Sequence, residues 1–120
     1  MNPWLLLAAA LALFLGAAHS FLGERVFFVR LFHRGPTAPI FAADAFARRT
    51  LRFVWHLTTV AWWGAAALLW VLGRGDAAAG LRVLAATFLA SGAVTALGSR
   101  GQHPAWLLFL AIAIATWLGA

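Results

Sequence analysis

The chain has 120 residues, of which 64% are hydrophobic and only 10% are charged, and its mean hydropathy is +0.90. A soluble domain is about half apolar and about a quarter charged, and a chain this short cannot bury so large an apolar excess within itself. The composition therefore excludes an ordinary soluble domain and predicts one integral membrane domain over residues 1–120. The chain has no Cys, which excludes disulfides, thiolate catalysis and iron–sulfur clusters.

Four apolar segments predict transmembrane helices, at residues 3–23, 51–73, 81–98 and 103–120. The first is about 20 residues long, enough to cross a hydrocarbon core of about 30 Å. A signal peptide cleaved near Ala17 is the alternative for this segment. We favour a retained helix because the first three residues carry no side-chain charge and the apolar run is longer than a signal peptide needs.

The connector at residues 24–50 predicts an interfacial helical elbow. Residues 24–34 mix large apolar side chains with Arg, which is typical of a helix at the membrane surface. Residues 35–39 contain Gly and two Pro and predict a turn, and residues 40–50 are expected to be helical again. The predicted fold is all-α, a four-transmembrane-helix bundle with this elbow between helices 1 and 2.

The distribution of Arg predicts the orientation in the membrane. Seven of the nine Arg lie in or beside the first and third connectors, and only two lie at the opposite face. We expect the long connector in the cytoplasm and both termini outside. The positive charge, +6 in all, suits anionic lipid rather than nucleic acid because the Arg cluster beside apolar segments.

Three histidines from three helices are predicted to lie in one layer near the cytoplasmic interface: His19, His56 and His103. Ionisable groups within a membrane span tend to face the protein interior, so the layer predicts a His-lined pocket. Glu24 lies near the same level, as a further ligand or as half of a surface ion pair. The other residues expected to line the pocket are Ser20, Thr59, Trp63, Ser99 and Gln102.

Neutral imidazole is a ligand for transition metals and haem, so His19, His56 and His103, with Glu24, form the candidate metal or haem site. The headgroup of a quinone or a lipid is another candidate ligand. The competing interpretation is that each His caps a helix end in contact with water or headgroups. Under that interpretation His103, which precedes Pro104, forms a hydrogen bond with the N-terminus of the last helix. No helix offers two ligands in a recognised spacing.

Two further patterns favour helix packing. Small residues recur every four positions in the first and third spans, where they permit close approach, and we expect the hydroxyls to bond across helices. The face of the second span with His56, Thr59 and Trp63 is likewise typical of a packing surface. Arg48, Arg49 and Arg52 form a basic cluster. We favour contact with anionic lipid or a role in setting the membrane topology, and the alternative is binding of an acidic partner or a phosphate ligand.

Three motifs each combine a His with Trp, Glu or Arg near a helix end, at residues 18–24, 55–58 and 99–106. With them the chain resembles small bacterial inner-membrane proteins, which implies a multi-pass protein of the bacterial inner (plasma) membrane. No complete catalytic set is present, so we expect a non-enzymatic accessory or binding subunit. Its partners would be the lipid bilayer, and other membrane subunits or copies of itself. The alternatives are a metal- or haem-binding redox protein and a small proton-coupled transporter.

Overall fold

The computed structural model describes residues 1–34, 36, 39 and 44–118, and all regular structure in these residues is helical. The first helix, α1 (Pro3–Leu22), continues through two π-helical segments, η1 (Gly23–Phe27) and η2 (Arg30–Arg34). Three helices follow: α3 (Ala45–Gly73), α4 (Ala78–Gly98) and α5 (Ala105–Leu118). The predicted all-α class is confirmed.

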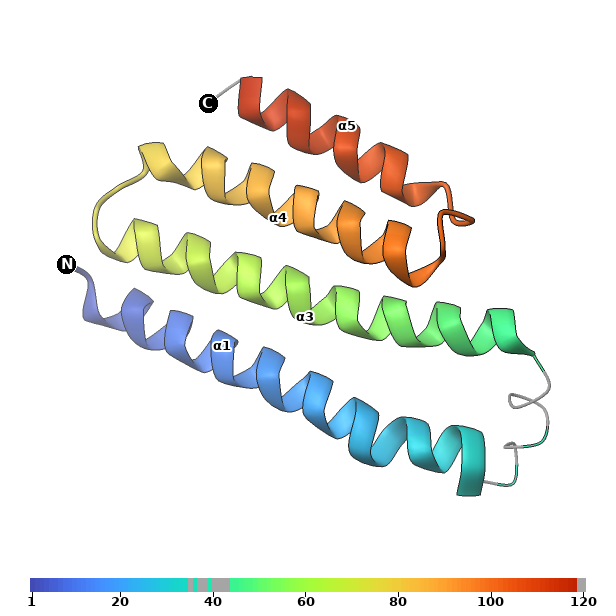
Figure 1. Ribbon diagram of the computed structural model, residues 1–120. Helices are drawn as coiled ribbons and strands as arrows, with labels where there is room; N and C mark the ends of the chain where they lie inside the picture. Colours follow the sequence, from blue (N-terminus) through green and yellow to red (C-terminus); the bar gives the residue numbers. More distant parts are fainter. Residues whose placement is uncertain (35, 37–38, 40–43, 119–120) are drawn as a thin grey trace.

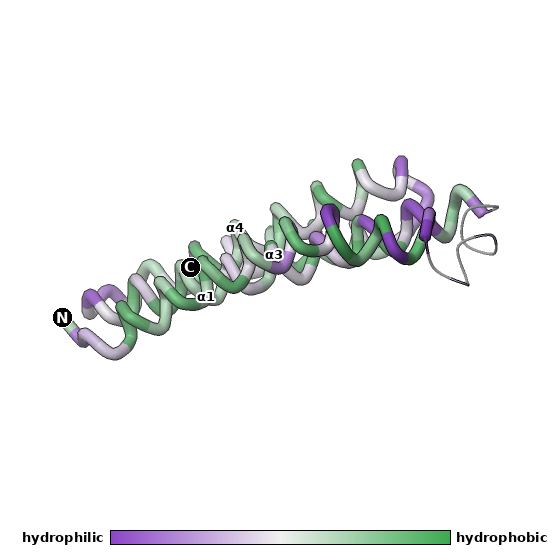
Figure 2. Tube along the Cα trace, turned by 90° about the horizontal axis from the view of Figure 1, so that it is seen from below, coloured by the Kyte–Doolittle hydropathy of each residue, from purple (hydrophilic) through white to green (hydrophobic). Residues whose placement is uncertain are grey.

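The four helices lie side by side in chain order and alternate in direction (Figure 1). The main helix pairs are α1 with α3, α3 with α4, and α4 with α5. The Cα trace extends 51 × 31 × 13 Å, so the helices form a single flat layer, seen edge-on in Figure 2. The predicted bundle therefore takes the form of a row, and each helix keeps apolar side chains on the two open faces. Phe14 and Leu97, for example, are 74% and 80% exposed.

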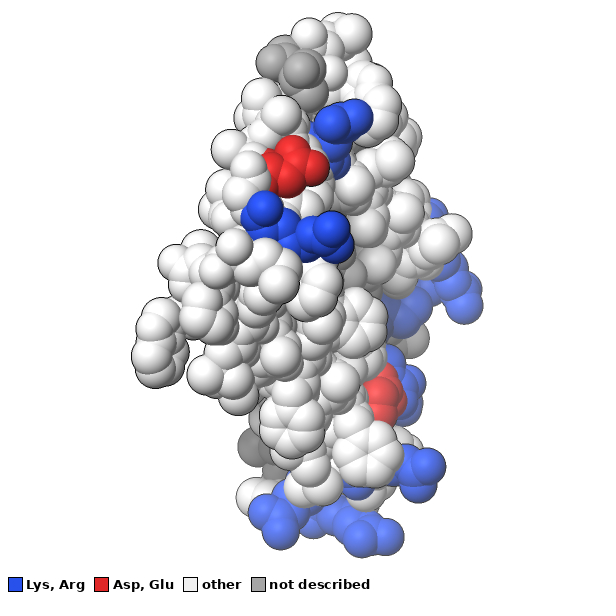
Figure 3. All heavy atoms as spheres, turned by 90° about the vertical axis from the view of Figure 1, so that its left-hand side faces the viewer, with Lys and Arg blue, Asp and Glu red and all other residues white. Residues whose placement is uncertain are grey.

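Among the residues that the structure describes, three helical segments are long and apolar enough to cross a membrane: Pro3–Arg34, Ala45–Gly73 and Ala78–Gly98. The 14 residues of α5 span only about 21 Å, less than a hydrocarbon core of about 30 Å. The fourth transmembrane helix therefore stays a prediction. Charged side chains gather toward the two ends of the layer, with a broad uncharged surface between them (Figure 3).

The helix ends differ from the predicted spans where side chains cap them. The helix α3 starts at Ala45, before the predicted span at 51–73 and within the stretch 40–50 that was expected to be helical. The carboxylate of Asp44 accepts hydrogen bonds there from the N–H groups of Phe46 and Ala47 at 2.9 and 3.2 Å. In the same way Asp76 accepts from Ala79 N–H at 3.1 Å, near the start of α4. A carboxylate at this position satisfies backbone donors that have no partner within the helix.

The predicted elbow lies partly outside the described residues, since positions 35, 37–38 and 40–43 belong to it. What the structure describes is the helical continuation of α1, which reaches Arg34 through the π segments. The turn at 35–39 and the first part of the helix at 40–50 stay predictions.

The prediction that hydroxyls bond across helices is confirmed for Ser20 of α1, which lies 2.7 Å from the hydroxyl of Thr59 on α3, and is wrong for the hydroxyls of the third span. Thr87, Ser91, Thr95 and Ser99 each donate to the backbone carbonyl four residues earlier, at 2.6–2.8 Å. A short hydroxyl side chain reaches its own helix more easily than the next one. Close contact between helices comes instead from glycine. A Cβ on Gly92 would lie 3.3 Å from Cβ of Phe109 on α5.

Candidate functional site

A polar network joins α1 and η1 to α3 near the basic end of the layer. The carboxylate of Glu24 accepts two hydrogen bonds from Nε of Arg52, at 3.0 and 3.1 Å, and one from Nη2 at 2.7 Å. The Nε2 atom of His56 lies 2.8 Å from the same carboxylate. Glu24 is therefore an ion-pair partner of Arg52 and a hydrogen-bond partner of His56 at once.

The network continues from His56 toward the middle of the α1–α3 pair. Its Nδ1 lies 2.9 Å from the hydroxyl of Ser20, which is 2.7 Å from the hydroxyl of Thr59. Thr59 can also donate to the carbonyl of Gly16 at 3.4 Å. With a neutral His56 that donates from Nε2 to Glu24, Ser20 donates to Nδ1 and Thr59 donates to Ser20. Every polar group of the network is then satisfied, which a polar cluster between membrane helices requires.

His19 lies on the other side of the α1–α3 contact and is held by aromatic rings. Its ring stacks on Trp55, with ring centroids 4.1 Å apart and planes 6° apart, and meets the edge of Trp62 at 4.9 Å. Trp55 Nε1 donates to the carbonyl of His19 at 3.0 Å. The indole also fits against Gly23, where any Cβ would collide with it. Among the described residues, the buried Nε2 of His19 has no hydrogen-bond partner.

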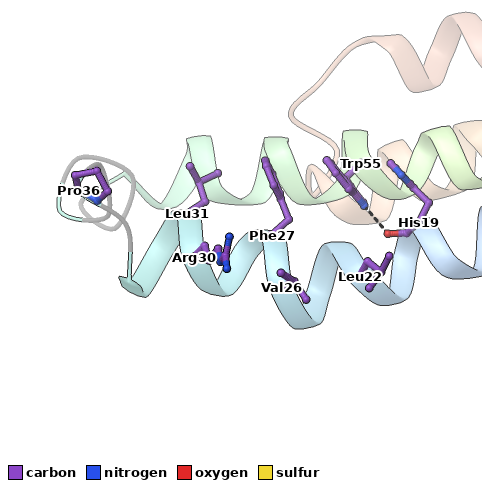
Figure 4. Close-up of a pocket in the computed structure, with 8 residues that line it drawn as sticks. All are labelled: His19, Leu22, Val26, Phe27, Arg30, Leu31, Pro36 and Trp55. Atoms are coloured by element: carbon purple, nitrogen blue, oxygen red, sulfur yellow. Dashed lines mark hydrogen bonds between the residues drawn. The ribbon is translucent and has the colours of Figure 1, made fainter.

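His19 and Trp55 line a cavity of about 670 Å³, whose other lining residues come from α1, the π segments and Pro36. Figure 4 shows the two rings at one end and Arg30, Leu31 and Pro36 farther along. The lining is largely apolar, with an imidazole at one end and a guanidinium toward the other. Such a cavity fits an elongated apolar molecule with polar groups. It is lined by His19, Leu22, Val26, Phe27, Arg30, Leu31, Pro36 and Trp55.

His103 has different partners from His19 and His56. Its ring meets the ring of Phe53 at 5.9 Å, and its Nδ1 accepts from the N–H of Ala105 at 3.3 Å, so it caps the start of α5. Ser99 accepts from the N–H of His103 at 3.2 Å, and Gln102 is exposed. Within the part of the chain that the structure describes, no group of three or more His, Cys, Asp or Glu is placed to hold a metal ion.

The predicted pocket residues thus separate into three places. Ser20 and Thr59 belong to the polar network. Trp63 donates from Nε1 to the carbonyl of Leu13 at 3.2 Å and packs on Gly16, as the predicted packing face requires. Ser99 and Gln102 lie at the turn between α4 and α5. Metal binding by His19, His56, His103 and Glu24 stays a prediction.

Sequence reasoning missed the role of Trp55 and the contribution of Arg100. The sequence favours Trp55 as an interfacial aromatic within the motif at residues 55–58, yet in the structure its ring stacks on His19 and lines one end of the cavity. The available signal was Gly23 at the end of the first span, since a glycine there permits a bulky ring to approach the backbone. Arg100, from the α4–α5 turn, joins Arg48, Arg49 and Arg52 around a second cavity.

The chain matches no known family model, and neither the curated proteins nor the solved structures include a significant match. The geometry of the α1–α3 site is therefore the basis for inferring a function.

Proposed function

We propose that this chain is a small non-enzymatic membrane subunit that binds an amphipathic lipophile in the His19–Trp55 cavity. The observation that carries the proposal is a largely apolar cavity with the imidazole of His19 in its lining at one end. The ring offers a polar contact to the head of a ligand whose body is apolar.

The size and shape of the cavity support a ligand with a ring or polar head and an apolar body. Its volume, about 670 Å³, is typical of small-molecule sites, which range over about 300–1,000 Å³. Phe27, which stacks on Trp55 at 4.6 Å, adds a second aromatic ring to the lining. A quinone or the head of a lipid has this combination of features.

The flat layer supports the accessory role. With both faces of the row apolar and exposed, lipid or another membrane subunit is expected to cover them. We place the basic end in the cytoplasm and the chain in the bacterial inner membrane, because Arg favours the cytoplasmic side of such membranes. A resident metal or haem and proton-coupled transport stay alternatives to be tested. No contact among the described residues supports either of them specifically.

The experiment is recovery of the bound molecule. Protein extracted from its native membrane in lipid nanodiscs is analysed by mass spectrometry for small lipophiles. Three forms are compared: the wild type, His19→Phe, which keeps a flat ring against Trp55 but has no ring nitrogen, and His33→Phe, a control at an exposed histidine outside the cavity.

We expect a lipophile with a hydrogen-bonding oxygen to accompany the wild type and His33→Phe and to be depleted in His19→Phe. Its absence from the wild type, or its full retention by His19→Phe, would refute the proposal. Elemental analysis and an absorption spectrum of the same samples test the metal and haem alternatives directly.

A further inference from the structure

Four arginines surround a cavity of about 270 Å³ at the basic end of the layer, separate from the His19 cavity. Arg48, Arg49 and Arg52 come from the first turns of α3, and Arg100 comes from the turn between α4 and α5. Ala45 completes the lining. The three residues of α3 formed a cluster in the sequence, but only the fold brings Arg100 to them across about 50 residues of chain.

The charge in this cavity is poorly compensated. Arg52 is paired with Glu24, whereas among the described residues Arg48, Arg49 and Arg100 make no ion pair. Against the carboxylates of Glu24 and of Asp44, the N-cap of α3, the four guanidinium groups leave a formal surplus of two positive charges. Arginines held together without counter-charges repel one another, so the arrangement favours an anion.

Several of these side chains are held in place before any ligand binds. The guanidinium of Arg48 lies over the ring of Phe32 at 5.1 Å, and that of Arg52 lies over Phe28 at 5.8 Å. The Nε atom of Arg49 is buried and has no hydrogen-bond partner within the described part of the chain.

The backbone at Arg100 gives independent support. The helix α4 ends in a Schellman motif, with Gly101 N–H bonded to the carbonyl of Ala96 at 2.7 Å and Arg100 N–H bonded to that of Leu97 at 3.2 Å. This motif needs a left-handed residue, which is normally glycine, but here it is Arg100 with φ 54°.

The end of α3 provides a comparison within the same chain. There the same pair of bonds runs from Asp76 to Val71 at 2.9 Å and from Gly75 to Leu72 at 3.0 Å, and the left-handed residue is Gly75, with φ 81°. Arginine therefore occupies at Arg100 a position that the fold alone would give to glycine. Strain of this kind at a charged residue indicates a role in binding.

We propose that Arg48, Arg49, Arg52 and Arg100 form a binding site for a phosphate group. The planar guanidinium fork matches the oxygens of phosphate and donates two hydrogen bonds at a time. The site lies at the end of the layer where α3 starts. A lipid headgroup would present its phosphate at this level. The phosphate belongs either to a lipid headgroup or to a water-soluble molecule.

The test measures binding by 31P NMR of purified protein in detergent micelles. One arm adds dioleoyl phosphatidic acid, and the other adds inorganic phosphate without lipid. Arg100→Gly removes the side chain and suits the left-handed backbone. Arg49→Gln removes the buried donor, and Arg82→Gln is the control at the opposite end of the layer.

We expect Arg100→Gly and Arg49→Gln to weaken binding by about tenfold or more, as for loss of a charge-assisted hydrogen bond, while Arg82→Gln binds like the wild type. Binding of phosphatidic acid alone assigns the site to a lipid headgroup, and binding of both probes assigns it to phosphate in general. Arg100→Gly should also keep or raise the thermal midpoint, because glycine relieves the strain. The proposal would be overturned if neither probe changed the 31P signal, or if Arg100→Gly bound phosphate like the wild type. It would also be overturned if Arg100→Gly lost binding and its thermal midpoint fell. None of these outcomes depends on the His19 cavity.

Discussion

The imidazole of His56 lies 2.8 Å from the carboxylate of Glu24, across the boundary between α3 and the π segment that follows α1. Because the same carboxylate also accepts from Arg52, one acidic residue joins two side chains of α3 to the segment that continues α1. Ser20 and Thr59 lie on the polar side of the contact, and His19 and Trp55 lie on the cavity side.

Glu24→Gln should lower the free energy of unfolding by about 1 kcal/mol. The amide keeps the shape but loses the ion pair, and the pair is partly exposed, with side chains 36% and 51% accessible, so the loss is modest. Thermal unfolding in detergent measures it. Arg25→Gln is the neighbouring control, since the guanidinium of Arg25 lies only over the Phe21 ring, at 5.7 Å.

A double-mutant cycle distinguishes the pair from general loss of charge. On the Glu24→Gln background, Arg52→Gln should cost less than it does in the wild type, because its partner is already gone. Fully additive effects of the two substitutions would show that the two side chains do not act together.

Gly23→Ala should destabilise the protein by about 1–3 kcal/mol through overpacking. The added methyl would collide with the indole of Trp55, which is fixed by its bond to His19 and cannot easily move. Gly80→Ala is the matched helical control, since its Cβ would lie 3.3 Å from the flexible end of Leu68. Thermal unfolding of both variants gives the comparison, and equal effects would contradict the close fit of Trp55 against the backbone.

Ser20→Ala should cost more stability than Ser91→Ala, although both remove one buried or half-buried hydroxyl. Ser20 bonds across helices to His56 and Thr59, whereas Ser91 bonds to the carbonyl of Thr87 in its own helix. Bonds between membrane helices contribute about 0.6 kcal/mol on average and up to about 1.7 kcal/mol. Unfolding measured in the same detergent compares the two, and a larger loss for Ser91→Ala would reverse the assignment.

The sequence predicted the helices well because apolar runs and turn residues are local signals. It could not give the partners of each histidine, since these depend on how the helices rotate against one another. His19 and His56 are both at the α1–α3 contact, yet one meets aromatic rings and the other meets a carboxylate. The contribution of Arg100 was hidden for a similar reason. It depends on the α4–α5 turn folding back to the start of α3.

The predicted spans are shorter than the helices because hydropathy does not detect capping residues. Asp44 starts α3 before the apolar run begins, within the stretch 40–50 that was expected to be helical. The interhelical role expected for the hydroxyls of α4 failed because spacing shows which side chains share a face, but not which acceptor each hydroxyl reaches.

The most direct measurement of the central claim is the 15N NMR signal of the His19 ring in native membranes, assigned by its loss in His19→Phe. If the cavity holds a lipophile, extracting small lipophiles should shift the ring nitrogen signals of His19, because the imidazole lines the cavity, and adding the extract back should restore them. The signals of His33 should not change. Ring nitrogen signals of His19 that stay the same through extraction and return would contradict a ligand at this imidazole.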